Sequence, residues 1–372
     1  MNRIPSGCRL HLAVEADGDG AHPASWRVSG RPPAAVLDVP ALRDTIAYAE
    51  AAGFALVTFA DSPLPPGTGR DAAGRIEAGV RAAYLSTLTD RIGLAPTLHT
   101  TTTEPFHLAT QLASLDHASR GRAAWVVGAT NSAEALATIG GTGPYEPDRL
   151  RGEVSDVIEV ARCLWDSWQD DAIIRDPTTG RFLDPDRVHH VNFTGGSFSV
   201  VGPLITPRPP QGQVVVIAAD TLGVTGQVDI ALVGGGDLTD VTQRARRVRE
   251  DDVPLVFAEV EVLLDATEPA AERLAALDRA SPWGATDRLR HVGSTDGLTT
   301  LLRQLAAVVD GVRLHPAVLT VDLPVLAERV LPALAADRLH VAPVAGATLR
   351  ATLGLPQPSN RFVDAAGAAT TS

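Results

Sequence analysis

The sequence predicts a single (β/α)8 barrel, also called a TIM barrel. Three observations predict it: short apolar runs alternate with amphipathic segments of helical period, eight strand-then-helix pairs can be counted, and no linker or internal repeat divides the chain. A chain of 372 residues is long enough for two domains, but barrels commonly use this length as one unit. An open, doubly wound sheet is the alternative that the same alternation leaves open.

The clearest strand, helix, strand unit runs from Arg91 to Thr130. Its two apolar runs are Ile92–Leu98 and Ala123–Val127, and about four helical turns of sequence separate them. Glu104 and Pro105 suit the start of a helix, because Pro is tolerated in the first turn and a carboxylate favours the positive end of the helix dipole. Parallel neighbouring strands need a crossover of this kind.

The other strands and helices follow from the same patterns, taken in chain order. Further apolar runs predict strands at 10–16, 55–60, 214–219, 230–233, 256–264 and 312–315. Helical periodicity predicts helices at 40–52, 78–88, 148–168, 238–250, 269–278, 298–309 and 324–334. Residues 169–213 are rich in turn pairs and are predicted to form an irregular insertion after the fourth helix. The domain is predicted to span residues 1–363, and the small, polar tail 364–372 is predicted to be disordered.

The composition argues against several classes of function. The formal net charge is -12, Lys is absent, and no basic run occurs, so nucleic-acid binding and Schiff-base chemistry on lysine are disfavoured. Cys8 and Cys163 are too few for a disulfide framework or a thiolate metal site, and the histidines lack metal-ligand spacing. We therefore expect no metal. Neither a signal peptide nor an apolar run of membrane length is evident, which predicts a soluble, cytoplasmic protein without membrane contact.

In a barrel, the active site lies at the carboxyl ends of the strands, and this rule selects the candidate residues. Asp61 follows the second strand and could orient a ligand N–H or hydroxyl, or could cap the next element. Thr97 and His99 belong to a hydroxyl-rich exit of the third strand. The remaining selected positions are Glu15, Asp17, Ser62, Thr100–Thr103, Gly128–Asn131, Ala219–Thr221, Gly234–Asp237, Asp265 and His315.

Several segments resemble one known family. The stretch TEPFHLATQLASLDHASRGRAAW, residues 103–125, resembles the bacterial luciferase-like flavin monooxygenases. Segments 10–27, 54–62, 164–212 and 322–334 agree with it in order, and the insertion is the most specific of them. The resemblance is to the subgroup of the nitrilotriacetate, pristinamycin and dibenzothiophene-sulfone monooxygenases, and it covers nearly the whole chain.

This resemblance implies a function and a set of site residues. It implies a dimeric or tetrameric barrel that uses dioxygen and reduced FMN, supplied by a separate flavin reductase, to oxygenate a small organic substrate. It places Asp61 and Thr97 near the flavin ring, and it assigns the phosphate-binding turn after the fifth strand to Ala219, Asp220 and Thr221. His22 and Trp26, in the long loop after the first strand, are predicted to line the substrate pocket together with His99.

The chain departs from the family pattern at three flavin-contacting positions, which are occupied here by Val126, Leu150 and Asp220. Each lost hydrogen bond is worth about 1 to 3 kcal/mol, so weak FMN binding is expected. These departures keep two alternatives open. The first is a catalytically degenerate barrel that acts as a partner subunit or a ligand-binding protein, and the second is a deazaflavin-dependent oxidoreductase.

Overall fold

The computed structural model describes residues 9–32, 37–64 and 74–363. Cys8 and the predicted disordered tail, 364–372, lie outside the described residues. The prediction that residues 1–363 form one domain stays a prediction.

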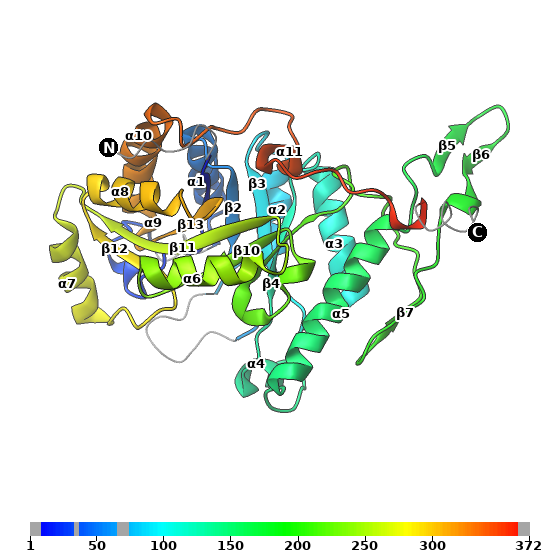
Figure 1. Ribbon diagram of the computed structural model, residues 1–372, viewed down its shortest axis with the longest axis horizontal. Helices are drawn as coiled ribbons and strands as arrows, with labels where there is room; N and C mark the ends of the chain where they lie inside the picture. Colours follow the sequence, from blue (N-terminus) through cyan, green and yellow to red (C-terminus); the bar gives the residue numbers. More distant parts are fainter. Residues whose placement is uncertain (1–8, 33–36, 65–73, 364–372) are drawn as a thin grey trace.

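Eight parallel strands form a closed barrel (Figure 1). The first strand pairs with the last in the register His11 to Gly311, and this pairing closes the ring. The (β/α)8 prediction is therefore confirmed, and the open sheet is wrong. In order around the barrel the strands are β1 (His11–Glu15), β2 (Leu56–Phe59), β3 (Gly93–His99), β4 (Ala124–Gly128), β9 (Val215–Ala219), β10 (Ile230–Val233), β11 (Leu255–Leu264) and β13 (Gly311–Pro316).

The predicted helices are present outside the barrel strands, against which their apolar faces pack. Most boundaries differ from the predicted ones by one to three residues, as frayed helix ends commonly do. The helices are α1 (Val39–Ala52), α2 (Ala78–Ser86), α3 (Pro105–Ala118), α5 (Pro147–Asp166), α6 (Leu238–Arg249), α7 (Ala270–Ala280), α8 (Thr295–Leu305), α9 (Leu319–Val325) and α10 (Leu331–Ala336).

The structure differs from the sequence prediction in a few elements. The last helix begins at Leu319 and not at Pro324, because Pro324 lies inside it and the chain continues through a wider π turn, Leu326–Val330, into α10. After β9 the chain forms two short 3-10 helices, Asp220–Leu222 and Thr225–Gln227, in place of an α-helix. The elements that the sequence did not predict are α4 (Ala133–Ala137), β12 (Leu289–Gly293) and α11 (Leu349–Leu353).

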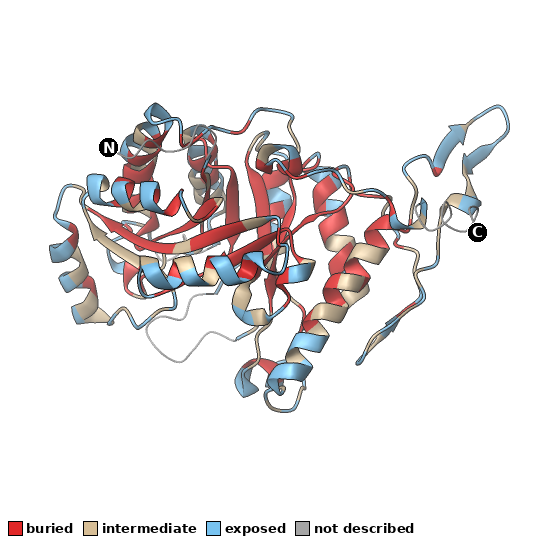
Figure 2. Ribbon diagram, viewed as in Figure 1, coloured by how far each residue is buried: buried red, intermediate tan, exposed pale blue. Residues whose placement is uncertain are grey.

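The interior of the barrel is a packed core at its amino-terminal end, where the strands are coloured as buried in Figure 2. The C-terminal segment closes this end, because Leu349, Leu353 and Leu355 pack against the inward-facing side chains of the strands. Those inward-facing side chains are Ala13, Leu56, Ala95, Ala124, Val215, Ile230 and Phe257.

The predicted irregular insertion follows α5 and extends away from the barrel (Figure 1). It contains two antiparallel ribbons, β5 (Ile173–Asp176) with β6 (Arg181–Leu183), and β7 (Phe193–Thr194) with β8 (Ser199–Val200). The end of the described chain returns to it, since the ring of Phe362 stacks on that of His189 with centroids 4.7 Å apart.

A buried carboxyl group fixes the connection between α3 and β4. Asp116 is fully buried, and its side chain accepts hydrogen bonds from the Ala123 backbone N–H, at 3.1 Å, and from Gln211 Nε2, at 2.7 Å. Burial disfavours the charged carboxylate more than these donors favour it, and the pKa of Asp116 is raised to about 6.

This raised pKa predicts a stability change with pH. The folded protein holds the Asp116 proton up to about pH 6, whereas the unfolded chain releases it near pH 3.8. The unfolding free energy should therefore fall by roughly 2 to 3 kcal/mol as the pH rises through this window. Asp116→Asn should remove that component, because the amide does not titrate and its oxygen can keep the two bonds. Chemical denaturation of both proteins between pH 4 and pH 7 checks this, and identical pH profiles would contradict it.

Candidate functional site

The inward-facing side chains change from apolar to charged toward the carboxyl ends of β1, β11 and β13. His315 is completely buried, with Nδ1 3.0 Å from Glu15 Oε1 and Nε2 3.1 Å from Glu259 Oε1. Arg313 donates from Nε to the same oxygen of Glu259 at 2.8 Å. Burial alone would raise the pKa of Glu15, but His315 and then Arg313 lower it to about 2. We call Glu15, Glu259, Arg313 and His315 the interior network.

Two of its four members were missed by sequence analysis. Glu15 and His315 are at strand exits and were selected, whereas Glu259 and Arg313 lie within the apolar runs that predicted the strands. The segment Phe257–Val262 reads FAEVEV, and its charges recur at every second residue. Such alternation puts both glutamates on one face of the strand, so it was the signal that could have found them.

The unpredicted strand β12 extends this charged region. It pairs with the last residues of β11, beyond the closed ring, and two arginines come from it and from the residue before it, Arg290 and Arg288. Arg290 donates from Nε to Glu261 at 2.8 Å and stacks over Trp283, with its guanidinium carbon 4.0 Å from the ring centroid. Arg288 lies 3.5 Å from the other oxygen of Glu261.

The loop after β1 packs against this region through His22. The ring of His22 is buried, accepts the Ala24 backbone N–H at Nδ1 (3.1 Å), and lies with Nε2 3.2 Å from Asp278 Oδ1. Burial lowers the pKa of His22, and Trp283 lies beside the ring with centroids 5.1 Å apart. One ring nitrogen is thus engaged within the loop and the other by Asp278 of α7. Trp26 is 45% exposed and does not join His22 in a described contact, so a pocket role for either residue stays a prediction.

Asp61 and His99 meet at the exits of β2 and β3. The Asp61 carboxylate accepts the backbone N–H groups of Ser62, at 2.8 Å, and of Ala78, the first residue of α2, at 2.6 Å. His99 lies with Nε2 3.2 Å from the Asp61 carbonyl oxygen and with Nδ1 2.9 Å from Thr130 Oγ1. A Cβ at Gly128 would lie 2.6 Å from His99 Nδ1, so the ring needs glycine at that position. Burial lowers the pKa of His99.

The side of the barrel formed by β2, β3, β4 and β9 offers free hydroxyl groups beside apolar side chains. Thr97 is half-buried, and its hydroxyl has no hydrogen-bond partner among the described residues. The same holds for the buried hydroxyl of Thr58 on β2, within the described part of the chain. Val126 pairs in register with Thr97 on one side and with Ile217 on the other. This side therefore combines an apolar wall with unsatisfied donors.

The turn after β9 is closed by ion pairs. Asp220 accepts two hydrogen bonds from Arg244 of α6, at 2.8 Å from Nε and at 2.5 Å from Nη2. Arg244 Nη1 lies 2.8 and 2.7 Å from the two carboxylate oxygens of Asp287. The hydrogen bonds with Asp220 raise the pKa of Arg244. Ala219 is half-buried and Thr221 is exposed, so this turn presents one free hydroxyl and a neutralised carboxylate.

Backbone N–H groups at the carboxyl end of β10 also have acceptors within the protein. Gly235 donates its N–H to the Asp287 carbonyl oxygen at 2.7 Å, and Gly236 donates to Asp240 Oδ2 at 3.2 Å. A Cβ at Gly234 would lie 1.7 Å from that same Asp287 oxygen. The glycines of this loop therefore allow a close approach of the Asp287 backbone.

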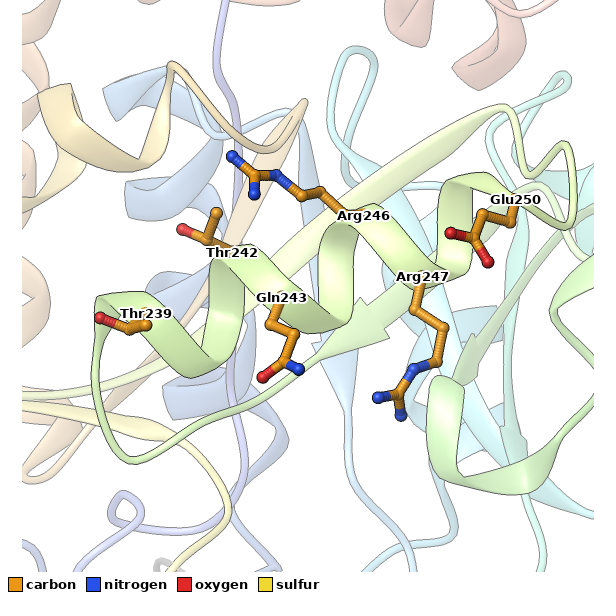
Figure 3. Close-up of a pocket in the computed structure, with 6 residues that line it drawn as sticks. All are labelled: Thr239, Thr242, Gln243, Arg246, Arg247 and Glu250. Carbon is orange, nitrogen blue, oxygen red and sulfur yellow. The ribbon is translucent and has the colours of Figure 1, made fainter.

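A shallow hollow on the outer surface of α6 is separate from these strand exits (Figure 3). All the side chains that line it are polar and come from this helix or from Glu250, the residue that follows it, so no second element lines it. They are Thr239, Thr242, Gln243, Arg246, Arg247 and Glu250. In the part of the chain that the structure describes, no three His, Cys, Asp or Glu side chains are arranged to hold a metal ion. None of the described helices is long and apolar enough to cross a membrane.

A closed barrel with polar side chains gathered at the strand exits defines the class of (β/α)8-barrel proteins. Within that class, the chain belongs to the luciferase-like monooxygenase family, whose model matches residues 21–319. The resemblance predicted from the sequence is confirmed.

Individual relatives differ in how much of their length is matched. N-acetyl-S-(2-succino)cysteine monooxygenase of Bacillus subtilis (strain 168) is 37% identical over 217 residues, which are 58% of this chain and 49% of the relative. One of the subunits of pristinamycin IIA synthase from Streptomyces pristinaespiralis is 31% identical over 332 residues, 89% of this chain and 94% of the relative. The solved structure of EDTA monooxygenase from Chelativorans sp. BNC1 covers 94% of this chain and 99% of its own, with a TM-score of 0.78 and 22% identity, and shows the fold. The chain spans about half the length of the first of these relatives.

Proposed function

We propose that this protein is a two-component flavin-dependent monooxygenase, which uses reduced FMN from a separate reductase and dioxygen to oxygenate a small organic substrate. The observation that carries the proposal is the family match over residues 21–319. A separate flavin reductase, a homodimer or homotetramer, and a cytoplasmic location complete the proposal.

The described residues fit the two ends of FMN unequally. A flavin ring is flat and apolar with a polar edge, and the hydroxyl of Thr97 beside Val126 and Ile217 offers that combination. The phosphate end does not fit the turn after β9, because the Arg244 guanidinium there already binds Asp220 and Asp287. The proposal therefore assigns no step to the phosphate group.

Two substitutions test the ring site. Asp61→Ala and Thr97→Val should each weaken flavin binding by about tenfold, the loss of one hydrogen bond to the ligand. The matched control is Thr110→Val on α3, whose hydroxyl bonds the Phe106 carbonyl oxygen within its own helix. Anaerobic calorimetric titration with reduced and oxidised FMN measures the affinities, and a circular dichroism melt checks the fold. Unchanged affinity in both site variants would remove the assignment of Asp61 and Thr97.

A second candidate function is that of a catalytically degenerate partner subunit. It is favoured by the match over nearly the full length of a relative that is one subunit of a synthase, together with Val126, Leu150 and Asp220 at positions where the family has flavin contacts. Rapid dioxygen consumption after mixing with reduced FMN is expected of the monooxygenase. An isolated partner subunit would not accelerate the consumption of dioxygen by reduced FMN, and neither would a deazaflavin-dependent hydride-transfer enzyme.

A further inference from the structure

The carboxyl ends of β9 and β10 are bridged by three side chains, Asp220, Arg244 and Asp287, which we call the acidic clamp. We infer that the acidic clamp makes this protein recognise its flavin through the ring and not through the phosphate, so that riboflavin and FMN bind with similar affinity. This inference rests on the proposed function, and it assigns to Asp287 the role of excluding the phosphate.

The charge of the clamp disfavours a phosphate dianion. Arg244 is the only cation in the clamp, and it makes hydrogen bonds to both carboxylates, two with each. The sum of two carboxylates and one guanidinium is a formal charge of -1. A phosphate group is held by donors that have no other acceptor and by uncompensated positive charge. The clamp supplies neither of these.

On the β10 side of the clamp, three backbone N–H groups are also engaged. Gly235 donates to the Asp287 carbonyl oxygen, Gly236 donates to the Asp240 carboxylate, and the Asp240 N–H donates to Asp237 Oδ1 at 2.9 Å. A glycine loop at a helix start commonly cradles phosphate with such groups. Here the same groups hold the loop against Asp287 and against the first turn of α6, and two more carboxylates are added to the region.

A further guanidinium beside the turn after β9 does not replace the missing charge. Arg151 of α5 lies against Gly223, where an added Cβ would be 2.9 Å from its Cδ. Its side chain is exposed and pairs with Asp148 at 3.1 Å. An exposed arginine that already has a carboxylate partner attracts an anion weakly in water.

The closing experiment compares riboflavin and FMN, which differ only by the phosphate. The purified full-length protein is titrated anaerobically with each flavin, both oxidised and reduced, and the dissociation constants are obtained from calorimetry. We expect the two constants to agree within about threefold. FMN binding that is tighter by about 100-fold or more would overturn the inference, since this is the advantage that a working phosphate site gives.

Asp287→Asn is the decisive variant. Asp287 is exposed, so its replacement leaves the core intact and brings the clamp to zero formal charge, while the amide keeps one acceptor oxygen for Arg244 Nη1. FMN should bind about tenfold more tightly, while the riboflavin constant stays within about twofold. The matched control is Asp337→Asn. Asp337 follows α10 and forms an exposed ion pair with Arg303, so this substitution removes the same charge at a distant site.

The outcomes separate the inference from the function on which it rests. An unchanged FMN to riboflavin ratio in Asp287→Asn, or an equal gain in Asp337→Asn, would overturn the role of Asp287. Absence of binding by either flavin in the folded protein would overturn the proposed function and the inference with it. Selective binding of FMN by the wild-type protein would leave the proposed function standing and overturn only the inference.

Discussion

Arg313→Met is expected to lower the unfolding free energy by about 3 to 5 kcal/mol. Arg313 is buried inside the barrel between Glu15 and Glu259, and its Nε donates to Glu259 Oε1 at 2.8 Å. Methionine fills a similar volume but leaves two carboxylates with one fewer cation in a site that excludes most water. Urea denaturation of both proteins at pH 7 measures the difference.

The pH dependence identifies the cause of this loss. Burial alone would raise the pKa of both glutamates. His315 and Arg313 instead hold the pKa of Glu15 near 2, and they also lower the pKa of Glu259. The stability contributed by a carboxylate of lowered pKa is present above its unfolded value, 4.5, and is lost as the pH falls toward the folded value. The gap between wild type and Arg313→Met should therefore narrow below about pH 4.5.

A matched substitution controls for the loss of an arginine. Arg303 pairs with Asp337 at the surface, and Arg303→Met should cost less than about 1 kcal/mol. The double variant Arg313→Met, Glu259→Gln should recover part of the loss, because it removes one of the two carboxylates that were left without Arg313. A loss for Arg313→Met no larger than that for Arg303→Met would contradict the account of the interior network.

The strands were predictable because parallel barrel strands are buried on both faces and so appear in the sequence as apolar runs. Glu259 and Arg313 were missed for the same reason, because each lies within an apolar run. Neither run indicates that the two side chains pair across β11 and β13. β12 was missed because its residues, LRHVG, lack both an apolar run and a long alternation.

The candidate site was less predictable than the fold, because its contacts join distant parts of the chain. His22 and Asp278 are 256 positions apart, so no local pattern indicates that the ring contacts α7. Asp220 could be selected as a strand-exit residue, but its partner Arg244 reads as one of several arginines on an amphipathic helix. The sequence left Asp61 open between a ligand role and a capping role; its carboxylate accepts the Ala78 N–H, and its contact with a flavin stays a prediction.

Arg350→Met should also lower the unfolding free energy by about 3 to 5 kcal/mol, through the opposite end of the barrel. Arg350 is buried in α11, donates from Nη2 to Asp229 at 2.8 Å and from Nε to the Gln213 carbonyl oxygen at 2.8 Å. Asp229 also accepts the Val216 backbone N–H at 2.9 Å. The substitution thus leaves the buried carboxylate directly before β10 with the Val216 N–H and with one guanidinium, that of Arg162 at 3.1 Å, in place of two.

The same substitution tests how the C-terminal segment closes the barrel. If Arg350 holds the segment, amide hydrogen exchange at Val215 and Val216 should speed up in Arg350→Met along with the loss of stability. The matched control is Arg361→Met, whose partner Glu159 is exposed, and which should change the unfolding free energy by less than about 1 kcal/mol. Equal effects of the two substitutions would mean that the buried pair of Arg350 and Asp229 adds nothing to the closure. The segment would then be held by the apolar packing of Leu349, Leu353 and Leu355 alone.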